Sequence, residues 1–379
     1  MKKVLVIHNN YRNRGGEDIA VENEIIFLKK YFEVHELIFE NSLTDIVSLL
    51  FSIIFGNNFK SNKRLKKIIE EFNPDLAYVH NTWFTASLGI FKILKDKNIK
   101  TFIKLHNFRY RCTNVFTESR HLDGENFCPS CGFHKRKFGF FNKYFENSYI
   151  KSLLVIIYGK RYFRLLNDPY FKILVLTKFH EKIFKEISSH RNVDVFPNFL
   201  QMHMSTSNQN KKYLVYAGRV SKEKGVEELI QAFLKSELED YSLKIIGNGP
   251  LLKNLINKYQ NRVDFLGQLP NEETITYIQN SSCVITATKL LEGQPTLLCE
   301  ASSVGVPSIF PNFGGMLEFF PNNYEFLFKQ YDYLDLILKL NNIKNFQNLE
   351  KFGNENQIYL SRYLNEEKLI AKFNILVNE

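Results

Sequence analysis

Two cations five residues apart are candidates for binding an anion. Arg219 and Lys224 follow a β-rich apolar run at residues 213–217; Gly218 precedes the arginine and Gly225 follows the lysine. An arginine binds an anion as a planar fork, whereas a lysine binds it as a point charge. Placed at the end of a strand, the pair suits a diphosphate group. The alternative is a pair of solvated surface charges.

Two carboxylates further along the chain are suited to binding a sugar and a ribose. Glu292 and Glu300 lie in the stretch Leu-Glu-Gly-Gln-Pro-Thr-Leu-Leu-Cys-Glu-Ala. Pro295 suits the first turn of a helix over residues 296–303, which leaves Glu292 in a loop and places Glu300 within the helix. The loop carboxylate can accept hydrogen bonds from sugar hydroxyls, and the helical one can reach a ribose diol. The alternative is one acid at a helix start and one solvated acid.

Glycine-containing turns after predicted strands complete the candidate ligand site. Gly15 and Gly16 lie between a first strand and a helix, where backbone N–H groups can approach an anion. A tight turn without a ligand is the alternative for this pair. A second turn, Gly247-Asn248-Gly249, follows another strand and brings the backbone close to a base or a ribose.

The strands and helices that carry these residues follow a regular pattern. Short β-rich apolar runs alternate with longer segments of helical period, as in a parallel sheet with crossover helices. We predict an α/β protein of two doubly wound domains, residues 1–200 and 201–379, facing each other across a cleft. Ligands in such sheets bind at the carboxyl ends of the strands. The last helical segment, residues 356–377, can pack on either domain. The predicted strands cover residues 3–8, 32–38, 75–80, 101–106, 173–177, 193–196, 213–217, 242–246, 262–266, 283–287 and 307–310.

A cysteine cluster lies in an insert of the first domain, which covers about residues 107–170. Cys112, Cys128, Cys131 and His134 include a Cys-x-x-Cys spacing, which suits a structural tetrahedral zinc site. Reduced structural thiols are the alternative. The chain has five cysteines, an odd number, and no recognisable secretory signal, so we expect a reducing cytoplasm rather than a disulfide framework.

The composition is that of a globular chain with a basic surplus. The 379 residues carry 50 Lys or Arg against 40 Asp or Glu, a net charge of +10. Residues 133–172 contain nine Lys or Arg, two Asp or Glu and twelve aromatic residues. Residues 46–55 are mostly apolar and are followed by a basic stretch. Such segments suit an anionic membrane surface, and core faces with solvated rims are the alternative. We expect no nucleic-acid partner, because no nucleic-acid motif accompanies the charge.

Taken together, these motifs resemble the retaining glycosyltransferases of family 4, which have the GT-B fold of two Rossmann-like domains. The resemblance covers most of the chain, from the Gly15-Gly16 loop to Gly305-Val306-Pro307, and includes His106 at the end of the fourth predicted strand. The chain departs from the family at Gln294, where an apolar residue is usual, and at Asn107, where the family often has Asp.

The resemblance implies transfer of a sugar, with retention at the anomeric carbon, from a UDP- or GDP-linked donor to a glycan or lipid-linked acceptor. Surface polysaccharide biosynthesis, of the lipopolysaccharide or capsule type, is the implied setting, with the protein cytoplasmic or peripheral on the inner face of the membrane. The N-terminal domain would bind the acceptor and the C-terminal domain the nucleotide sugar. No cofactor is expected in catalysis, because two cations can stabilise the departing diphosphate and no Asp-x-Asp ends a strand.

The implied roles divide the site residues into two groups, and rival functions remain open. The rivals are a nucleotide-sugar epimerase or hydrolase of the same fold and a catalytically silent nucleotide-sugar-binding subunit. The implied catalytic residues are His106, Arg219, Lys224 and Glu292. The implied nucleotide-sugar-binding residues are Gly15, Gly16, Gly218, Gly247, Asn248, Gly249, Gly293, Gln294, Pro295, Thr296 and Glu300.

Overall fold

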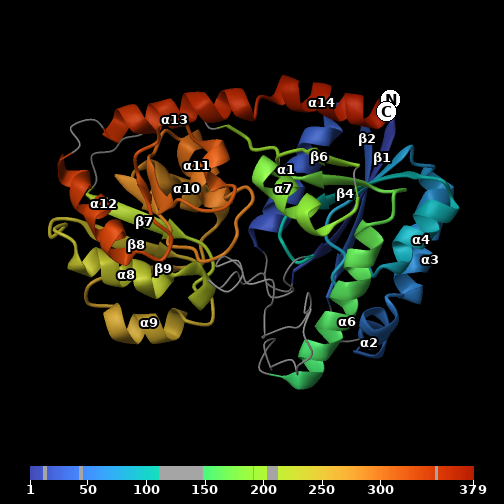
Figure 1. Cartoon of the computed structure of the whole chain (residues 1–379), viewed down its shortest axis with the longest axis horizontal. Coiled ribbons are helices and arrows are strands. Elements are labelled where there is room, and N and C mark those ends of the chain that lie inside the picture. Colours follow the sequence, from blue (N-terminus) through green and yellow to red (C-terminus); the bar gives the residue numbers. More distant parts are fainter. Residues whose placement is uncertain (12–14, 42–45, 111–147, 191, 203–211, 346–348) are drawn as a thin grey trace. The chain divides into compact units, whose positions relative to one another are not determined.

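Two compact units make up the chain. Contacts define an N-terminal unit of residues 1–199 with 369–379, and a C-terminal unit of residues 200–368. Each unit is built on one six-stranded parallel sheet with helices packed on it (Figure 1), which confirms the predicted α/β class. The computed structural model describes residues 1–11, 15–41, 46–110, 148–190, 192–202, 212–345 and 349–379.

The sheet of the N-terminal unit has the strand order β2-β1-β3-β4-β5-β6. Its strand β1 buries Val4, Leu5 and Val6 completely, as expected for a parallel strand covered on both faces. The strands are β1 (Lys3–Asn10), β2 (Glu33–Glu40), β3 (Leu76–Val79), β4 (Lys100–Leu105), β5 (Lys172–Val175) and β6 (Val193–Val195). The helices are α1 (Gly16–Lys29), α2 (Ile46–Phe55), α3 (Phe59–Phe72), α4 (Gly89–Asp96), α6 (Tyr149–Leu166) and α7 (Lys178–Ile187).

The sheet of the C-terminal unit has the order β12-β11-β10-β7-β8-β9. The structure confirms all eleven predicted strands, whereas β12 has only two residues and is too short for an apolar pattern to predict. The strands are β7 (Tyr213–Ala217), β8 (Ser242–Ile246), β9 (Asp264–Gly267), β10 (Cys283–Ile285), β11 (Ser308–Pro311) and β12 (Leu327–Phe328). The helices are η2 (Lys222–Lys224), α8 (Val226–Lys235), α9 (Leu252–Tyr259), α10 (Asn271–Gln279), α11 (Thr296–Ser303), η3 (Met316–Phe319), α12 (Tyr333–Asn345) and α13 (Leu349–Tyr363).

The last predicted helical segment, residues 356–377, is two helices in the structure. α13 ends at Tyr363, and α14 (Glu366–Asn378) begins after Asn365, whose Oδ1 accepts a hydrogen bond from Lys368 N at 3.0 Å. Such a side-chain cap starts a new helix and interrupts the periodic pattern that predicts a single one. α13 packs on α11 of the C-terminal unit, whereas residues 369–379 belong to the N-terminal unit.

Helix α14 completes the core of the N-terminal unit. Phe373 is fully buried, and its ring lies near the rings of Phe32, Tyr78, Phe102 and Phe196, with centroids 5.5 to 6.1 Å apart. Figure 1 marks both ends of the chain at this unit. Among the described helices, none combines the length and the apolar composition that crossing a membrane requires.

Candidate functional site

Four loops at the carboxyl edge of the C-terminal sheet are tied together by backbone hydrogen bonds. The loops follow β7, β8, β10 and β11, and parallel strands bring these ends to one edge. The predicted residues from Gly218 to Glu300 therefore lie on connected segments. The bonds run from Gly218 N to Ile246 O, from Val220 N to Asn248 O, from Lys289 N to Glu223 O and from Gly315 N to Glu292 O, each at 2.9 Å.

Gly247 and Gly225 stand where these loops meet backbone to backbone. A Cβ on Gly247 would lie 2.0 Å from the Gly218 carbonyl oxygen, and a Cβ on Gly225 would lie 2.0 Å from the Ala287 carbonyl oxygen. Both residues also have a positive φ, +130° and +65°, which other residues rarely adopt. The two glycines thereby fix the backbone beside both predicted cations.

The structure joins the predicted lysine to the first predicted carboxylate. Lys224 Nζ lies 2.6 Å from Glu292 Oε1, and Thr288 Oγ1 donates a hydrogen bond to the same oxygen at 3.0 Å. Both charged side chains are partly exposed, so a ligand can reach them. Because Glu292 neutralises the lysine in this state, a diphosphate bound to Lys224 would release a Glu292 oxygen for another hydrogen-bond donor.

Arg219, the other predicted cation, has an exposed side chain. The Tyr216 hydroxyl donates a hydrogen bond to the Arg219 carbonyl oxygen at 2.9 Å, which holds the backbone at this position. Within the described part of the chain, its guanidinium makes no hydrogen bond or ion pair. The side chain is therefore free to turn toward an anion.

Helix α11 carries the second predicted carboxylate and covers the predicted residues 296–303. Glu300 is 8% exposed, and this burial raises the pKa of its carboxyl to about 7. Gln294 hydrogen-bonds the Cys299 thiol, which gives a local role to the residue that departs from the family pattern. Gly293 and Gln294 form the loop before the helix, Pro295 is its N-cap and Thr296 is its first residue.

His106 follows β4 in the N-terminal unit, and the structure pairs it with a second histidine. His106 Nε2 lies 2.8 Å from Nδ1 of His80, which follows β3. Burial lowers the pKa of both imidazoles well below the usual value, so both rings are neutral at physiological pH. One ring must therefore donate its N–H to the other.

A buried ion pair adjoins the two histidines. Lys104 of β4 donates to Glu24 of α1, and the Tyr78 hydroxyl donates to the other Glu24 oxygen at 3.0 Å. Burial raises the pKa of Glu24 and lowers that of Lys104, and the contact between the two opposes both shifts. Sequence reasoning missed this pair. The available signal is a lysine inside the apolar run of β4, which requires a buried partner.

The Glu24 carboxylate orients the histidine pair. Its Oε2 lies 3.8 Å from His80 Nε2, and its negative charge favours the tautomer with a proton on that nitrogen. His80 Nδ1 then accepts the proton of His106 Nε2, which leaves His106 Nδ1 with a lone pair. That nitrogen is buried and makes no hydrogen bond to any described residue. It can accept a hydrogen bond from a substrate hydroxyl.

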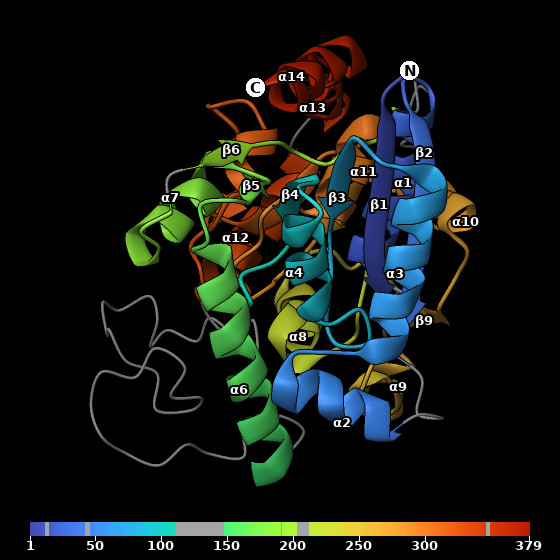
Figure 2. The same cartoon turned by 90° about the vertical axis from the view of Figure 1, so that its right-hand side faces the viewer.

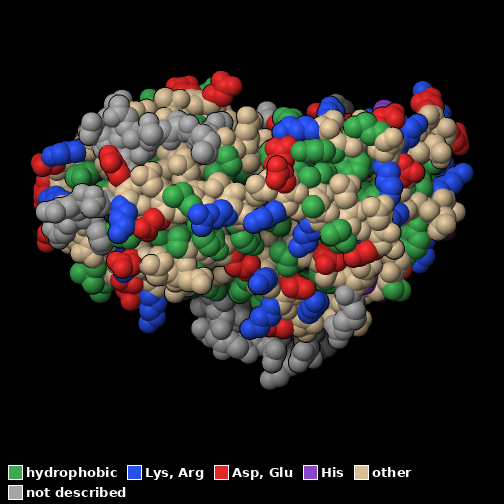
Figure 3. Space-filling model, turned by 90° about the horizontal axis from the view of Figure 1, so that it is seen from above, with side chains coloured by type: hydrophobic (Ala, Val, Ile, Leu, Met, Phe, Trp, Pro, Cys, Tyr) green, Lys and Arg blue, Asp and Glu red, His purple; other side chains and the backbone are tan. Residues whose placement is uncertain are grey.

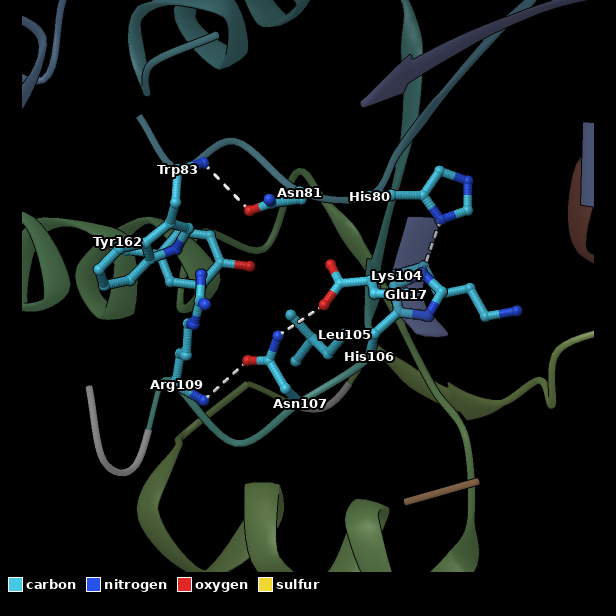
Figure 4. A pocket seen from close by; sticks show the side chains of 10 residues that line it. All are labelled: Glu17, His80, Asn81, Trp83, Lys104, Leu105, His106, Asn107, Arg109 and Tyr162. Atoms are coloured by element: carbon cyan, nitrogen blue, oxygen red, sulfur yellow. Dashed lines mark hydrogen bonds between the residues drawn. The ribbon is translucent and has the colours of Figure 1, made fainter. Parts of the chain in front are cut away.

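A polar pocket lies at the carboxyl ends of β3 and β4, and both histidines and Lys104 are among the residues that line it (Figure 4). Glu17 Oε2 accepts hydrogen bonds from the Tyr11 hydroxyl at 2.7 Å and from Asn107 Nδ2 at 2.9 Å. The Arg109 guanidinium lies 4.9 and 5.3 Å from the ring centroids of Tyr11 and Trp83. Convergent polar groups beside aromatic rings suit a hydroxyl-bearing ligand. The lining residues are Glu17, His80, Asn81, Trp83, Lys104, Leu105, His106, Asn107, Arg109 and Tyr162.

Asn107, the other departure from the family pattern, has a structural reason to be an amide. Its Nδ2 donates to Glu17, and its Oδ1 accepts from Arg109 N at 3.0 Å. An ionised aspartate could accept the second bond but could not make the first, and its charge would repel the Glu17 carboxylate.

The predicted phosphate loop at the start of α1 is partly occupied by the chain itself. Gly15 is the N-cap of the helix and Gly16 is its first residue. Gly15 N donates to Asp18 Oδ2 at 2.8 Å, and Asp18 Oδ1 lies 2.9 Å from His8 Nε2. A phosphate at this helix end would meet the Asp18 carboxylate, so its binding by the two glycines stays a prediction.

The predicted zinc ligands Cys112, Cys128, Cys131 and His134 lie outside the described residues. Within the described ranges, no group of three or more His, Cys, Asp or Glu side chains is arranged to hold a metal ion. Zinc at the cysteine cluster therefore stays a prediction.

Two separate doubly wound parallel sheets, each with polar loops at its carboxyl edge, define the GT-B architecture. Residues 200–370 match the family model described as "Glycosyl transferases group 1". This segment of the chain is similar to the glycosyltransferases of that family, which confirms the resemblance seen in its motifs.

Curated relatives match parts of the chain. An uncharacterized glycosyltransferase, MJ1059, of Methanocaldococcus jannaschii is 27% identical over 279 residues, which are 66% of this chain and 58% of that protein. A Bacillus subtilis protein named as a teichuronic acid biosynthesis glycosyltransferase, TuaC, is 29% identical over 120 residues, 32% of this chain and 30% of TuaC. The chain thus spans less than two thirds of the length of these relatives.

Solved structures share the fold over the whole chain. Sucrose-phosphate synthase from Thermosynechococcus elongatus superposes with a TM-score of 0.74 at 14% identity, covering 100% of this chain and 98% of the synthase. Anabaena HepE in complex with UDP-glucose superposes with a TM-score of 0.68 at 14% identity and covers 100% of both chains. At these identities the likeness establishes the fold.

Proposed function

We propose that this chain is a retaining glycosyltransferase that transfers a hexose from a UDP-linked donor to a glycan or lipid-linked acceptor. The observation that carries the proposal is the Lys224–Glu292 pair, which lies at the carboxyl edge of the sheet within the segment that matches the family model. HepE binds UDP-glucose in the same fold, which supports UDP as the nucleotide, with GDP the alternative. TuaC is named for teichuronic acid biosynthesis, which supports an acceptor in polysaccharide biosynthesis. We place the reaction at the cytoplasmic side of the membrane as part of the same proposal.

In this reaction the chain's own cations supply the electrostatic stabilisation. The departing diphosphate gains negative charge in the transition state, and Arg219 and Lys224 would stabilise it together with the N-terminus of α11. Glu292, released from Lys224, would accept hydrogen bonds from the donor sugar, and Glu300 would bind the ribose diol. The leaving diphosphate can itself take the acceptor proton on the same face of the sugar, so neither a separate base nor a metal ion is needed.

A donor screen tests the proposal. UDP-sugars should raise the melting temperature of the protein, because a ligand at 100 times its Kd adds about 2.7 kcal/mol of stability. The stabilising donor should then give a glycosylated product with a retained anomeric configuration in the presence of EDTA. Stabilisation by GDP-sugars alone would show that the donor carries GDP instead of UDP. Release of free sugar without any acceptor would identify a hydrolase. Stabilisation without turnover on any acceptor would favour a silent binding subunit.

Because the pKa of Glu300 is raised, we expect nucleotide binding to depend on pH. With a pKa of about 7, its carboxyl is mostly ionised at about pH 8 and mostly protonated at about pH 6. Only the ionised form accepts hydrogen bonds from both ribose hydroxyls, so the Kd for UDP should rise about tenfold from the higher to the lower pH. Isothermal titration calorimetry measures this change.

The Glu300→Gln variant is the control for this prediction. The variant should bind UDP more weakly than the wild type. The ratio of the two Kd values cancels the titration of the nucleotide phosphate, which is the same for both proteins. This ratio should fall at low pH, where Glu300 of the wild type is also uncharged. Without nucleotide, the variant should melt at a higher temperature than the wild type at about pH 8. The sign follows because a raised carboxyl pKa makes the folded state lose stability as the pH rises through that pKa. If the Kd for UDP changed with pH in the same way in both proteins, Glu300 would not bind the nucleotide.

A further inference from the structure

Two neighbouring helices of the N-terminal unit, and the start of a third, expose apolar side chains. Eight of the fifteen large apolar side chains that are exposed in the described part of the chain lie on α2, at the start of α3 and on the first turns of α6. Phe59 is 74% exposed and Ile150 is 73% exposed. We call this set the apolar face: Leu50, Phe51, Ile54, Phe55, Phe59, Tyr149, Ile150 and Leu153.

The helices α2 and α6, which carry seven of the eight side chains of the apolar face, lie side by side. α2 packs against α6, and Figure 2 shows α2 beside the lower half of α6. On α2, Phe51 and Phe55 are one turn apart with ring centroids 4.9 Å from each other, while the intervening Ser52 and Ile53 are buried. Each helix thus buries one side in the unit and presents apolar side chains, instead of the usual polar ones, to the outside.

The charged residues of α6 and of the first part of α3 have a single sign. Neither α2 nor α6 contains an Asp or Glu, and residues 59–67 contain none either. The face drawn in Figure 3, by contrast, mixes acidic and basic side chains. The cations on α3 and α6 are Lys60, Lys63, Arg64, Lys66, Lys67, Lys151, Lys160, Arg161 and Arg164.

We propose that the apolar face docks the N-terminal unit on an anionic lipid bilayer. Phenylalanine and leucine side chains would enter the boundary between headgroups and acyl chains, and the adjacent cations would bind the lipid phosphates and carboxylates. The uniform positive charge selects an anionic partner, and rows of aromatic and aliphatic side chains one helical turn apart suit a fluid apolar layer. The proposal stands independently of the proposed activity, because it rests on this surface alone.

Vesicle sedimentation with the full chain tests the docking. The wild type should sediment with vesicles that contain phosphatidylserine and remain in solution with pure phosphatidylcholine vesicles, and salt should weaken the binding. Phe51→Gln/Phe55→Gln should lower the partition coefficient at least about tenfold through lost apolar burial. Lys63→Glu/Lys66→Glu should lower it by more than about twentyfold, since each lysine near an anionic surface contributes about fivefold.

Matched controls place the same substitutions on the C-terminal unit. Leu334 and Leu338 on α12 are 75% and 61% exposed, so Leu334→Gln/Leu338→Gln removes comparable apolar surface. Lys253→Glu/Arg262→Glu reverses two exposed cations, one on α9 and one just after it. These variants should bind as the wild type does. All variants should keep the wild-type melting temperature and UDP-induced shift, which separates lost docking from misfolding and from failure of the proposed function.

Two outcomes would overturn the proposal. The first is a wild type that does not bind anionic vesicles at low salt, or apolar-face variants that bind as tightly as the controls. The second is a dimer, detected by light scattering, that Phe51→Gln/Phe55→Gln converts to a monomer while vesicle binding is unchanged. The apolar face would then be an interface between two copies of the chain.

Discussion

Lys224→Ala is expected to lower kcat about a hundredfold while leaving the protein folded. The lysine charge is needed most when the diphosphate departs, so its loss should affect turnover more than donor binding. The side chain is partly exposed and contacts Glu292, so no buried charge is left unpaired by the substitution. Steady-state kinetics with the donor identified by thermal shift provide kcat and KM separately.

Lys222→Ala is the matched control for this variant. Lys222 lies on the same short helix, η2, and its side chain is exposed, so the substitution removes the same charge two residues away. The control should keep at least half of the wild-type kcat. A wild-type kcat in Lys224→Ala would show that this lysine does not act in turnover. An equal loss in the control would show that general positive charge rather than a specific contact acts at this loop.

Lys104→Met is expected to lower the free energy of unfolding by about 3 to 5 kcal/mol. Lys104 and Glu24 are both almost completely buried, so removal of the lysine leaves an uncompensated carboxylate in the core. The loss should be smaller at acidic pH, because protonation of Glu24 then removes the buried charge. Urea unfolding at two pH values measures both effects.

Two further variants separate the ion pair from packing. Glu24→Leu/Lys104→Met removes both charges and should recover most of the stability, since well-packed apolar residues often replace a buried pair without loss. Lys29→Met breaks the exposed pair in which Lys29 Nζ lies 2.6 Å from Glu36 Oε1, and should cost less than about 1 kcal/mol. Equal costs for Lys104→Met and Lys29→Met would mean that Lys104 is hydrated rather than buried.

The two sheets could be predicted from the sequence because both faces of each sheet are covered. Such strands are short continuous apolar runs between helical segments, and this pattern predicts eleven of the twelve strands that the described residues form. Strand β12 and the break at Asn365 were not predicted, because a two-residue strand and a helix cap are too short to alter an apolar period. The predicted strand ends also place Arg219, Lys224 and Glu292 at the carboxyl edge of the sheet. The roles of these residues remain predictions.

The polar network of the N-terminal unit could not be predicted in the same way. Lys104 and Glu24 are 80 residues apart in the chain and meet only because α1 packs on the sheet beside β4. The pairing of His80 with His106 likewise depends on the order of β3 and β4 in the sheet. A single sequence shows the lysine within an apolar run, but it does not show which acid lies opposite.

The position of α14 has a consequence for how the protein is made. Strand β6 ends at Val195, but Phe373, which fills the core of the same unit, is synthesised only after the whole C-terminal unit. At about 5 to 20 residues per second, the ribosome needs about 9 to 36 s for this interval. During that time the nascent N-terminal sheet displays Phe32, Tyr78 and Phe102 without their cover, and this is when we expect chaperones to bind the growing chain.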